Sequence, residues 1–147
     1  MRILGIDLGT KSMGLAITDT SQTIINALEN FEFAKNNYEL CFERLRKLVD
    51  TYKNEIGTIV LGWPLKLSGE KSDWTITVEN FGKKLVKLFP TIKIMLQDER
   101  MTTKNATESL KYSMGLKCSK IKKIKDKMSA YLILEEYLSA SNKHRKE

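Results

Sequence analysis

An apolar run at the start of the chain ends on a carboxylate. Residues 2–6 read Arg-Ile-Leu-Gly-Ile, Asp7 follows, and a short glycine-containing segment leads to a second apolar run at residues 13–18. Runs of this kind predict two buried strands joined by a tight turn. A lone charge at the end of a central strand is costly to bury. Asp7 therefore either caps the turn or is compensated by a cation, and the apolar strand before it favours the cation.

The pattern of apolar residues predicts an α/β fold with one mixed five-stranded sheet. We expect strands at residues 2–6, 13–18, 23–33, 58–61 and 92–96, in the order βββαβαβαα. Short polar turns join the first three strands, which indicates an antiparallel meander, and helical crossovers bring the later strands into the same sheet, with helices on both faces. Active groups in such sheets gather beyond the carboxyl ends of the central strands.

The expected helices follow from spacings of three and four between apolar residues. The first should begin at Asn36-Asn37, and the second should begin at Ser72 and stop at Pro90. Two more are expected, one over residues 104–112 and one that carries apolar residues from Ala130 to Leu138 on one face.

Length and composition define a single small domain. The 147 residues predict one domain over residues 1–140, followed by a polar tail at 141–147. We expect a cytoplasmic protein without a membrane partner, since no apolar run approaches a spanning length and no leader pattern opens the chain. The single histidine, His144, lies in the tail, and Cys41 and Cys118 lack a paired spacing. Any hydrolysis would then depend on carboxylates that hold a hard cation.

Most of the excess positive charge lies in one segment. The chain has a net charge of +7, and residues 111–127 contain seven lysines and one aspartate, a net charge of +6. A solvated loop is one interpretation. The other is a surface that binds the phosphate backbone of a nucleic acid, with Lys120, Lys122 and Lys123 as non-specific contacts.

Three acidic positions are candidates for one metal site. Asp7 follows the first strand, Asp98 and Glu99 follow the fifth, and Asp126 lies one helical turn before Ala130. Like charges that meet so closely need a cation to offset them, and one or two Mg²⁺ or Mn²⁺ ions could activate water at a phosphodiester.

Each acid also has a simpler interpretation. Asp126 could be a helix N-cap, and Glu99 could form a surface ion pair with Arg100 or Lys93. Adjacent residues of a strand face opposite ways, so only one of Asp98 and Glu99 can easily reach the metal. We expect Glu99 to be the ligand and Asp98 a supporting group.

Four motifs in order resemble a known family. They are Gly-Ile-Asp7-Leu-Gly9-Thr10-Lys11 with Gly14, Gly62-Trp63-Pro64, Asp98-Glu99-Arg100-Met101-Thr102-Thr103 with Ala106, and Asp126-Lys-Met-Ser-Ala130 with Ile133-Leu134. The chain resembles, from Arg2 to about Leu138, the YqgF-type family of pre-16S ribosomal RNA nucleases, also called Holliday-junction-resolvase-like proteins.

The resemblance implies a ribonuclease H-like fold and a metal-dependent nuclease that trims the 5′ end of precursor 16S rRNA in the bacterial cytoplasm. It implies that Asp7, Glu99 and Asp126 form the acidic triad, and that Lys11 and Arg100 contact phosphate.

The chain departs from the family pattern at three positions. Ser12 replaces a more usual basic residue, and Ser129 replaces one of two alanines. Trp63 replaces a smaller apolar residue, which makes it a candidate stacking surface for a base.

Other functions remain open on the residues alone. Resolution of four-way DNA junctions would use the same chemistry, and a dimer, because two symmetric cuts need two sites. A non-catalytic RNA-binding factor that assembles on ribosomal particles is a second alternative. The segment Asp7-Leu8-Gly9-Thr10 also matches the first phosphate loop of sugar-kinase and actin-like ATPases, but those proteins need two related domains. No residue identifies RNA over DNA, because none is recognisable as a reader of a 2′-hydroxyl.

Overall fold

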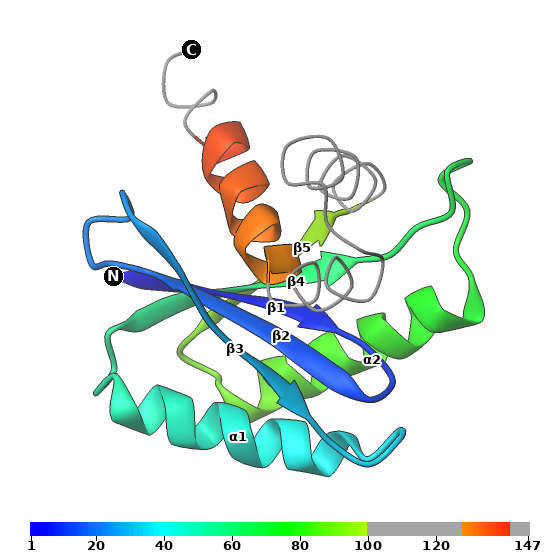
Figure 1. Ribbon diagram of the computed structural model, residues 1–147, viewed down its shortest axis with the longest axis horizontal. Helices are drawn as coiled ribbons and strands as arrows, with labels where there is room; N and C mark the ends of the chain where they lie inside the picture. Colours follow the sequence, from blue (N-terminus) through cyan, green and yellow to red (C-terminus); the bar gives the residue numbers. More distant parts are fainter. Residues whose placement is uncertain (100–127, 142–147) are drawn as a thin grey trace, which may run out of the picture.

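The computed structural model describes residues 1–99 and 128–141, which form one sheet and three helices (Figure 1). The strands are β1 (Arg2–Leu8), β2 (Ser12–Thr18), β3 (Ile25–Glu32), β4 (Ile56–Trp63) and β5 (Lys93–Asp98). The helices are α1 (Tyr38–Thr51), α2 (Asp73–Leu88) and a helix over residues 128–141, called here the C-terminal helix. The helix expected over residues 104–112 and the whole lysine-rich segment at residues 111–127 lie outside the described residues.

The sheet has the strand order β3-β2-β1-β4-β5. β1 pairs antiparallel with β2, and β2 with β3, whereas β4 lies parallel to both β1 and β5. The predicted mixed five-stranded sheet is therefore confirmed. Because β1, β4 and β5 run in the same direction, their carboxyl ends meet at one edge of the sheet, called here the carboxyl edge.

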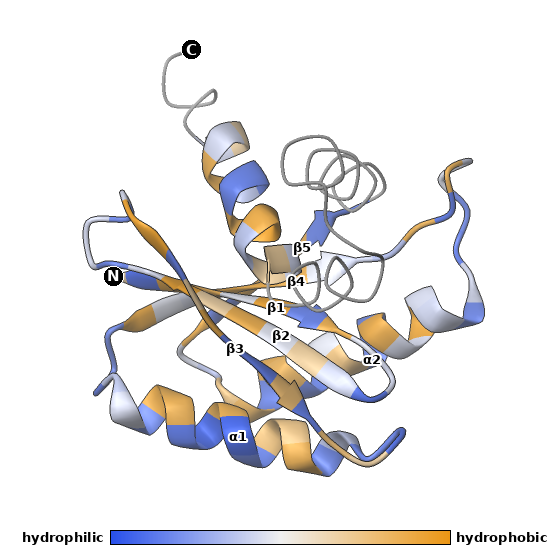
Figure 2. Ribbon diagram, viewed as in Figure 1, coloured by the Kyte–Doolittle hydropathy of each residue, from blue (hydrophilic) through white to orange (hydrophobic). Residues whose placement is uncertain are grey.

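Helices cover both faces of the sheet, as expected. α1 and α2 lie on one face and the C-terminal helix lies on the other (Figure 1). The first face carries the larger core, which contains Ile6, Leu61 and the buried side of α1. The second carries a smaller core of six buried residues, which are Ile3, Ala16, Val60, Ala130, Ile133 and Leu134. In Figure 2 the central strands are largely hydrophobic, and α1 alternates hydrophobic with hydrophilic residues, as a half-buried helix should.

Local chemistry fixes the two ends of α2. The Ser72 hydroxyl accepts a hydrogen bond from the Thr75 backbone N–H at 3.2 Å, and the Thr75 hydroxyl accepts one from the Ser72 N–H at 3.0 Å. This reciprocal capping box starts the helix, and Pro90 follows its C-cap, Phe89. Asn37 is the N-cap of α1 by position, but its side chain makes no capping hydrogen bond, so packing of the buried face holds that helix in place.

Every strand differs from the sequence prediction by one or two residues at one end or at both, and β3 and β4 show why. β4 is longer than residues 58–61, because its ladder to β1 begins at Ile56 and its ladder to β5 continues through Gly62 to Trp63. β3 begins at Ile25 instead of Thr23, because the Asp19 carboxylate accepts hydrogen bonds from the N–H groups of Thr23 and Ile24. Those bonds keep both residues in the β2–β3 turn and hold the pKa of Asp19 well below its usual range. Within the described residues no helix has the length and apolar character to cross a bilayer.

Candidate active site

A row of laterally paired residues crosses the sheet at the carboxyl edge, and Asp7 lies in this row. Asp7 lies opposite Gly14 of β2. On its other side lies β4, where Gly62 follows Leu61, the partner of Ile6. Asp7 is therefore flanked by a glycine on each neighbouring strand.

The pleat of the sheet decides which acids share a face. Ile3 and Val60 pack under the C-terminal helix, and side chains two apart along a strand share a face. Asp7, four residues after Ile3, therefore faces the C-terminal helix, as does Gly62. The same alternation from Met95 of β5 places Glu99 on this face and Asp98 on the opposite one.

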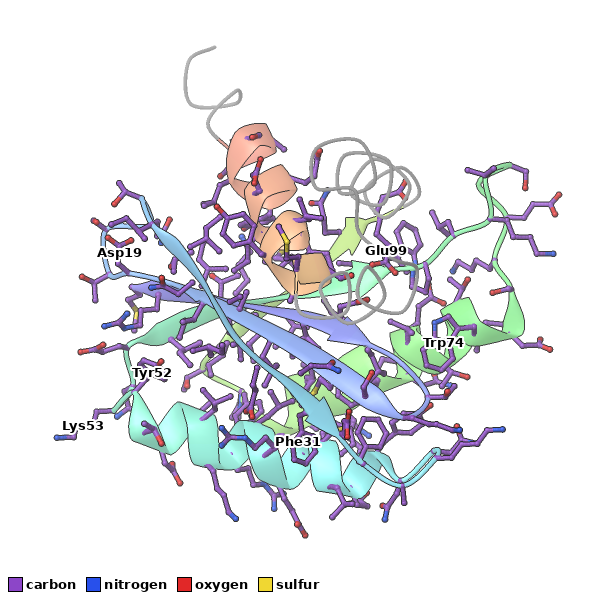
Figure 3. The ribbon with its side chains drawn as sticks, viewed as in Figure 1. Asp19, Phe31, Tyr52, Lys53, Trp74 and Glu99 are labelled. Carbon is purple, nitrogen blue, oxygen red and sulfur yellow. The ribbon has the colours of Figure 1, made fainter. Side chains whose placement is uncertain are left out.

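Glu99 extends the β5 ladder by one residue and its side chain turns back towards Asp7. Its backbone N–H donates to the Trp63 carbonyl oxygen at 3.3 Å, which fixes the start of the side chain. Figure 3 shows Glu99 just beyond the end of β5, close to the beginning of the C-terminal helix. The Glu99 carboxyl forms a hydrogen bond with the Asp7 side chain. Asp7 and Glu99 are called here the acid pair.

The acid pair shares a proton at neutral pH. Burial, the charge of Asp7, the hydrogen bond to Asp7 and the charge of Asp98, in that order of size, together raise the pKa of Glu99 to about 8. A protonated Glu99 carboxyl can donate a hydrogen bond to the Asp7 carboxylate. The proton also removes the repulsion that two adjacent negative charges would have.

The acid pair fits a hard divalent cation. Carboxylate oxygens are the ligands that Mg²⁺ and Mn²⁺ prefer, and a cation could replace the shared proton. The Gly62 position forms a cradle for the Glu99 carboxylate, since an added Cβ there would lie 2.6 Å from Glu99 Oε2. Within residues 1–99 and 128–141 no three metal-binding side chains form a cluster. The predicted third acid, Asp126, lies outside the described residues.

Trp63 lies at the carboxyl edge but on the face opposite the acid pair, since its register partner is Asp98. The Trp63 indole N–H donates to Glu79 Oε2 at 3.2 Å. Glu79 also forms an ion pair with Lys71 at 2.9 Å, and the hydrogen bond from Lys71 holds the pKa of Glu79 below its usual range. The indole is therefore partly buried and held in one orientation.

Lys11 lies in the β1–β2 turn with an exposed side chain. The turn is closed by a hydrogen bond from the Gly9 N–H to the Ser12 carbonyl at 2.7 Å, and the Lys11 carbonyl accepts one from Phe33 at 2.9 Å. Its backbone is fixed while its ammonium group is free to extend from the carboxyl edge. The other predicted basic contacts lie outside the described residues: Arg100, Lys120, Lys122 and Lys123.

Two residues of the site had no role predicted from the sequence. Gly62 was recognisable only as part of a motif, and its contact with Glu99 depends on the register of three strands. Asn30 pairs with Gly14, so it belongs to the same row as Asp7. Its buried Oδ1 has no hydrogen-bond partner among the described residues. A polar residue in an edge strand is too common for sequence reasoning to single out.

The fold and the acid pair define the class of protein. Thermus thermophilus RuvC superposes with a TM-score of 0.55 at 14% identity, over 96% of this chain and 97% of that chain. Fowlpox virus resolvase bound to Holliday junction DNA superposes with a TM-score of 0.53 at 12% identity, over 95% and 98% of the two chains. The chain therefore has the ribonuclease H-like fold of these resolvases, and the predicted fold class is confirmed.

Sequence similarity then identifies the family. The family described as "RuvX: Holliday junction resolvase" matches residues 1–140, and the chain belongs to this family. A protein of Ureaplasma parvum named "Putative pre-16S rRNA nuclease" is 44% identical over 97% of this chain and 99% of the relative. Relatives of the same name from Mycoplasmopsis pulmonis and Geobacillus thermodenitrificans are 43% and 36% identical, each over 95% of this chain and over 93% and 99% of the relatives. The expected resemblance to the YqgF-type family is confirmed.

Proposed function

We propose that this chain is a metal-dependent nuclease that hydrolyses phosphodiester bonds and processes the 5′ end of precursor 16S rRNA in the bacterial cytoplasm. The observation that carries the proposal is the acid pair, which lies at the carboxyl edge with glycines on both sides of Asp7. The names of the relatives supply the substrate. The domain would comprise residues 1–140, the span of the family match, with residues 141–147 as a tail.

Each predicted site residue has a distinct task in this proposal. Asp7, Glu99 and Asp126 would hold one or two Mg²⁺ or Mn²⁺ ions, and Asp98, on the other face, would add negative charge nearby. A bound divalent ion supplies Lewis acidity at the phosphate and lowers the pKa of water. Glu99 must lose its proton for this, so cation binding should release a proton below about pH 8.

The basic and aromatic residues would bind the nucleic acid. Lys11 at the carboxyl edge would contact a phosphate beside the acid pair, together with Arg100. Lys120, Lys122 and Lys123 would hold the strand further away. Trp63, fixed by Glu79, would stack on an unpaired base that passes over the edge to the other face. Ribosomal particles are a further partner in this proposal, because the precursor is processed during ribosome assembly.

The direct test is cleavage of precursor 16S rRNA by the purified protein with Mg²⁺ or Mn²⁺. Asp7→Asn should lower the rate by at least about 100-fold, since even groups that only support metal ligands cost 10–100-fold when removed. Asp50→Asn is the matched control, because Asp50 is exposed at the end of α1. Equal rates for Asp7→Asn and the wild-type protein would refute the proposal.

Resolution of four-way DNA junctions is the second candidate. The family description and the structural likeness to junction resolvases favour it. The two substrates are best compared in one assay, with sizing of the protein in solution, because symmetric cuts require a dimer. Binding of rRNA without cleavage by the wild-type protein would instead indicate a non-catalytic assembly factor.

A further inference from the structure

We propose that Gly62 is a positioning residue for the acid pair, because its missing side chain is what lets the Glu99 carboxylate lie over β4 and reach Asp7. The inference rests on the proposed function, since it assigns the acid pair to cation binding. It adds to that proposal a residue that touches neither cation nor substrate.

The topology forces the Glu99 side chain to cross β4. β5 and β1 are separated by β4 in the sheet, and neighbouring strands lie about 4.8 Å apart, so the backbones of β5 and β1 are about 10 Å apart. The Glu99 backbone is held on β4 by its hydrogen bond to Trp63. Between this point and Asp7, Gly62 is the residue of β4 that faces the C-terminal helix. Any side chain at position 62 would therefore stand in the path of Glu99.

The distances show how little space is left. A Cβ at position 62 would lie 2.6 Å from Glu99 Oε2 and 3.2 Å from Glu99 Cδ. Separations below 3.0 Å are essentially never seen for real Cβ atoms, so an alanine would push the carboxylate away. The carboxylate cannot move freely, because it is hydrogen-bonded to Asp7. Displacement would separate the acid pair.

Position 62 also contacts the C-terminal helix, and this second contact must be separated from the first. The same Cβ would lie 2.6 Å from Ile133 Cδ1. Valine lacks that carbon atom, so Gly62→Ala combined with Ile133→Val removes the contact with Ile133 Cδ1 and keeps the number of carbon atoms constant. Of the three atoms nearest to the added Cβ, the two that remain in this double variant both belong to Glu99.

Gly5 provides a control beneath the same helix. A Cβ there would lie 2.6 Å from Leu134 Cγ and 3.0 Å from the Ala130 carbonyl oxygen, and none of its three nearest atoms belongs to Glu99. Gly5→Ala therefore disturbs the packing of the C-terminal helix on the sheet without disturbing the Glu99 carboxylate directly.

The experiment measures Mn²⁺ binding by isothermal titration calorimetry, with circular dichroism and thermal melting to verify folding. The double variant should bind Mn²⁺ at least about tenfold more weakly than Ile133→Val alone, in line with the loss of groups that orient metal ligands. The Mn²⁺ concentration for half-maximal cleavage should rise by the same factor. Gly5→Ala should lower the melting temperature with a smaller effect on Mn²⁺ affinity.

A thermodynamic cycle shows whether Gly62 acts through Glu99. In a Glu99→Ala background the Gly62→Ala change should cost no further Mn²⁺ affinity, because interacting residues are non-additive whereas independent ones add. A folded double variant with the Mn²⁺ affinity of Ile133→Val would overturn the inference, as would full additivity in the cycle.

Failure of the proposed function would look different. If the wild-type protein binds neither Mn²⁺ nor Mg²⁺, the cation site is wrong, and the inference is then decided by the carbon-13 shift of the Glu99 carboxyl in metal-free protein. A shift displaced towards that of an isolated glutamate in the double variant supports the positioning role, and an unchanged shift overturns it.

Discussion

At the scale of single residues, the acid pair should make the stability of metal-free protein depend on pH. The folded-state pKa of Glu99 is about 8, above the ordinary 4.5, so the folded protein binds a proton that the unfolded chain releases between these values. The resulting stability is fully present below about pH 4.5 and is lost as the pH rises through 8. In urea melts with EDTA, the free energy of unfolding should fall from pH 5 to pH 8.5.

Glu99→Gln should flatten this dependence, because glutamine keeps a donor for Asp7 and cannot ionise. Glu79→Gln is the matched control. The pKa of the Glu79 carboxyl is lowered in the folded protein, so the stability that Glu79 contributes is lost only as the pH falls through the acidic range. The slope between pH 5 and 8.5 should survive in Glu79→Gln, and an unchanged slope in Glu99→Gln would contradict the shared proton. The chain's single histidine lies in the tail.

Replacing Asn30 or Thr18 with alanine should have different effects on the free energy of unfolding. The buried Thr18 hydroxyl accepts from the Ile3 N–H at 2.9 Å and donates to the Asp19 carbonyl at 2.9 Å. Thr18→Ala should cost about 1–3 kcal/mol, because it leaves a buried N–H without a partner. Asn30→Ala removes an acceptor that already lacks one among the described residues, so the free energy of unfolding should be unchanged or higher. Urea melts compare the two, and a larger loss for Asn30→Ala would contradict this account.

The sequence indicated Asp7 and Glu99 but not what brings them together. Both acids follow apolar strands. Alternation showed that only one of Asp98 and Glu99 can easily reach the site, and the family resemblance named Glu99. The contact over Gly62 depends on the pairing of β1, β4 and β5, which are separated by helical crossovers and cannot be aligned from local pattern. For the same reason the face on which Trp63 lies was not predictable. The roles of Asp126, Arg100 and the three lysines stay predictions.

At the scale of elements, the ends that local chemistry sets were predictable and the ends that pairing sets were not. Ser72 and Pro90 bound α2 as expected, because capping and the missing proline N–H act within a few residues. β3 and β4 were misjudged at their ends, because Asp19 and the neighbouring strands decide where those ladders stop.

The two helix N-caps give a test of this distinction. Ser72→Ala should lower the free energy of unfolding by about 1 kcal/mol, because it removes the capping box of α2. Asn37→Ala should cost clearly less, because the Asn37 side chain makes no capping hydrogen bond. Urea melts of both variants at one pH provide the comparison. Equal losses would mean that capping does not determine where α2 begins.

At the scale of the whole molecule, the two faces of the sheet have different tasks. The larger core beneath α1 and α2 holds the strands together. The C-terminal helix covers the face of the acid pair through the smaller core and approaches closely over Gly5. The proposed chemistry is therefore built on the side with less buried apolar surface, at an edge where Gly62 leaves room for the Glu99 carboxylate beside Asp7.

The distribution of charge predicts how nucleic-acid binding depends on salt. If Lys120, Lys122 and Lys123 each contact one phosphate, replacing all three with alanine should reduce the slope of log affinity against log salt by about 2 for single-stranded RNA. The control replaces the exposed Lys47, Lys53 and Lys87 of the α1 and α2 region with alanine, which lowers the net charge of +7 by the same amount. Filter binding of precursor rRNA between about 50 and 200 mM salt covers the informative range. If both triple variants change the slope equally, net charge alone governs binding, and the lysine-rich segment has no special place in it. A change confined to the first variant would assign the phosphate backbone to that segment.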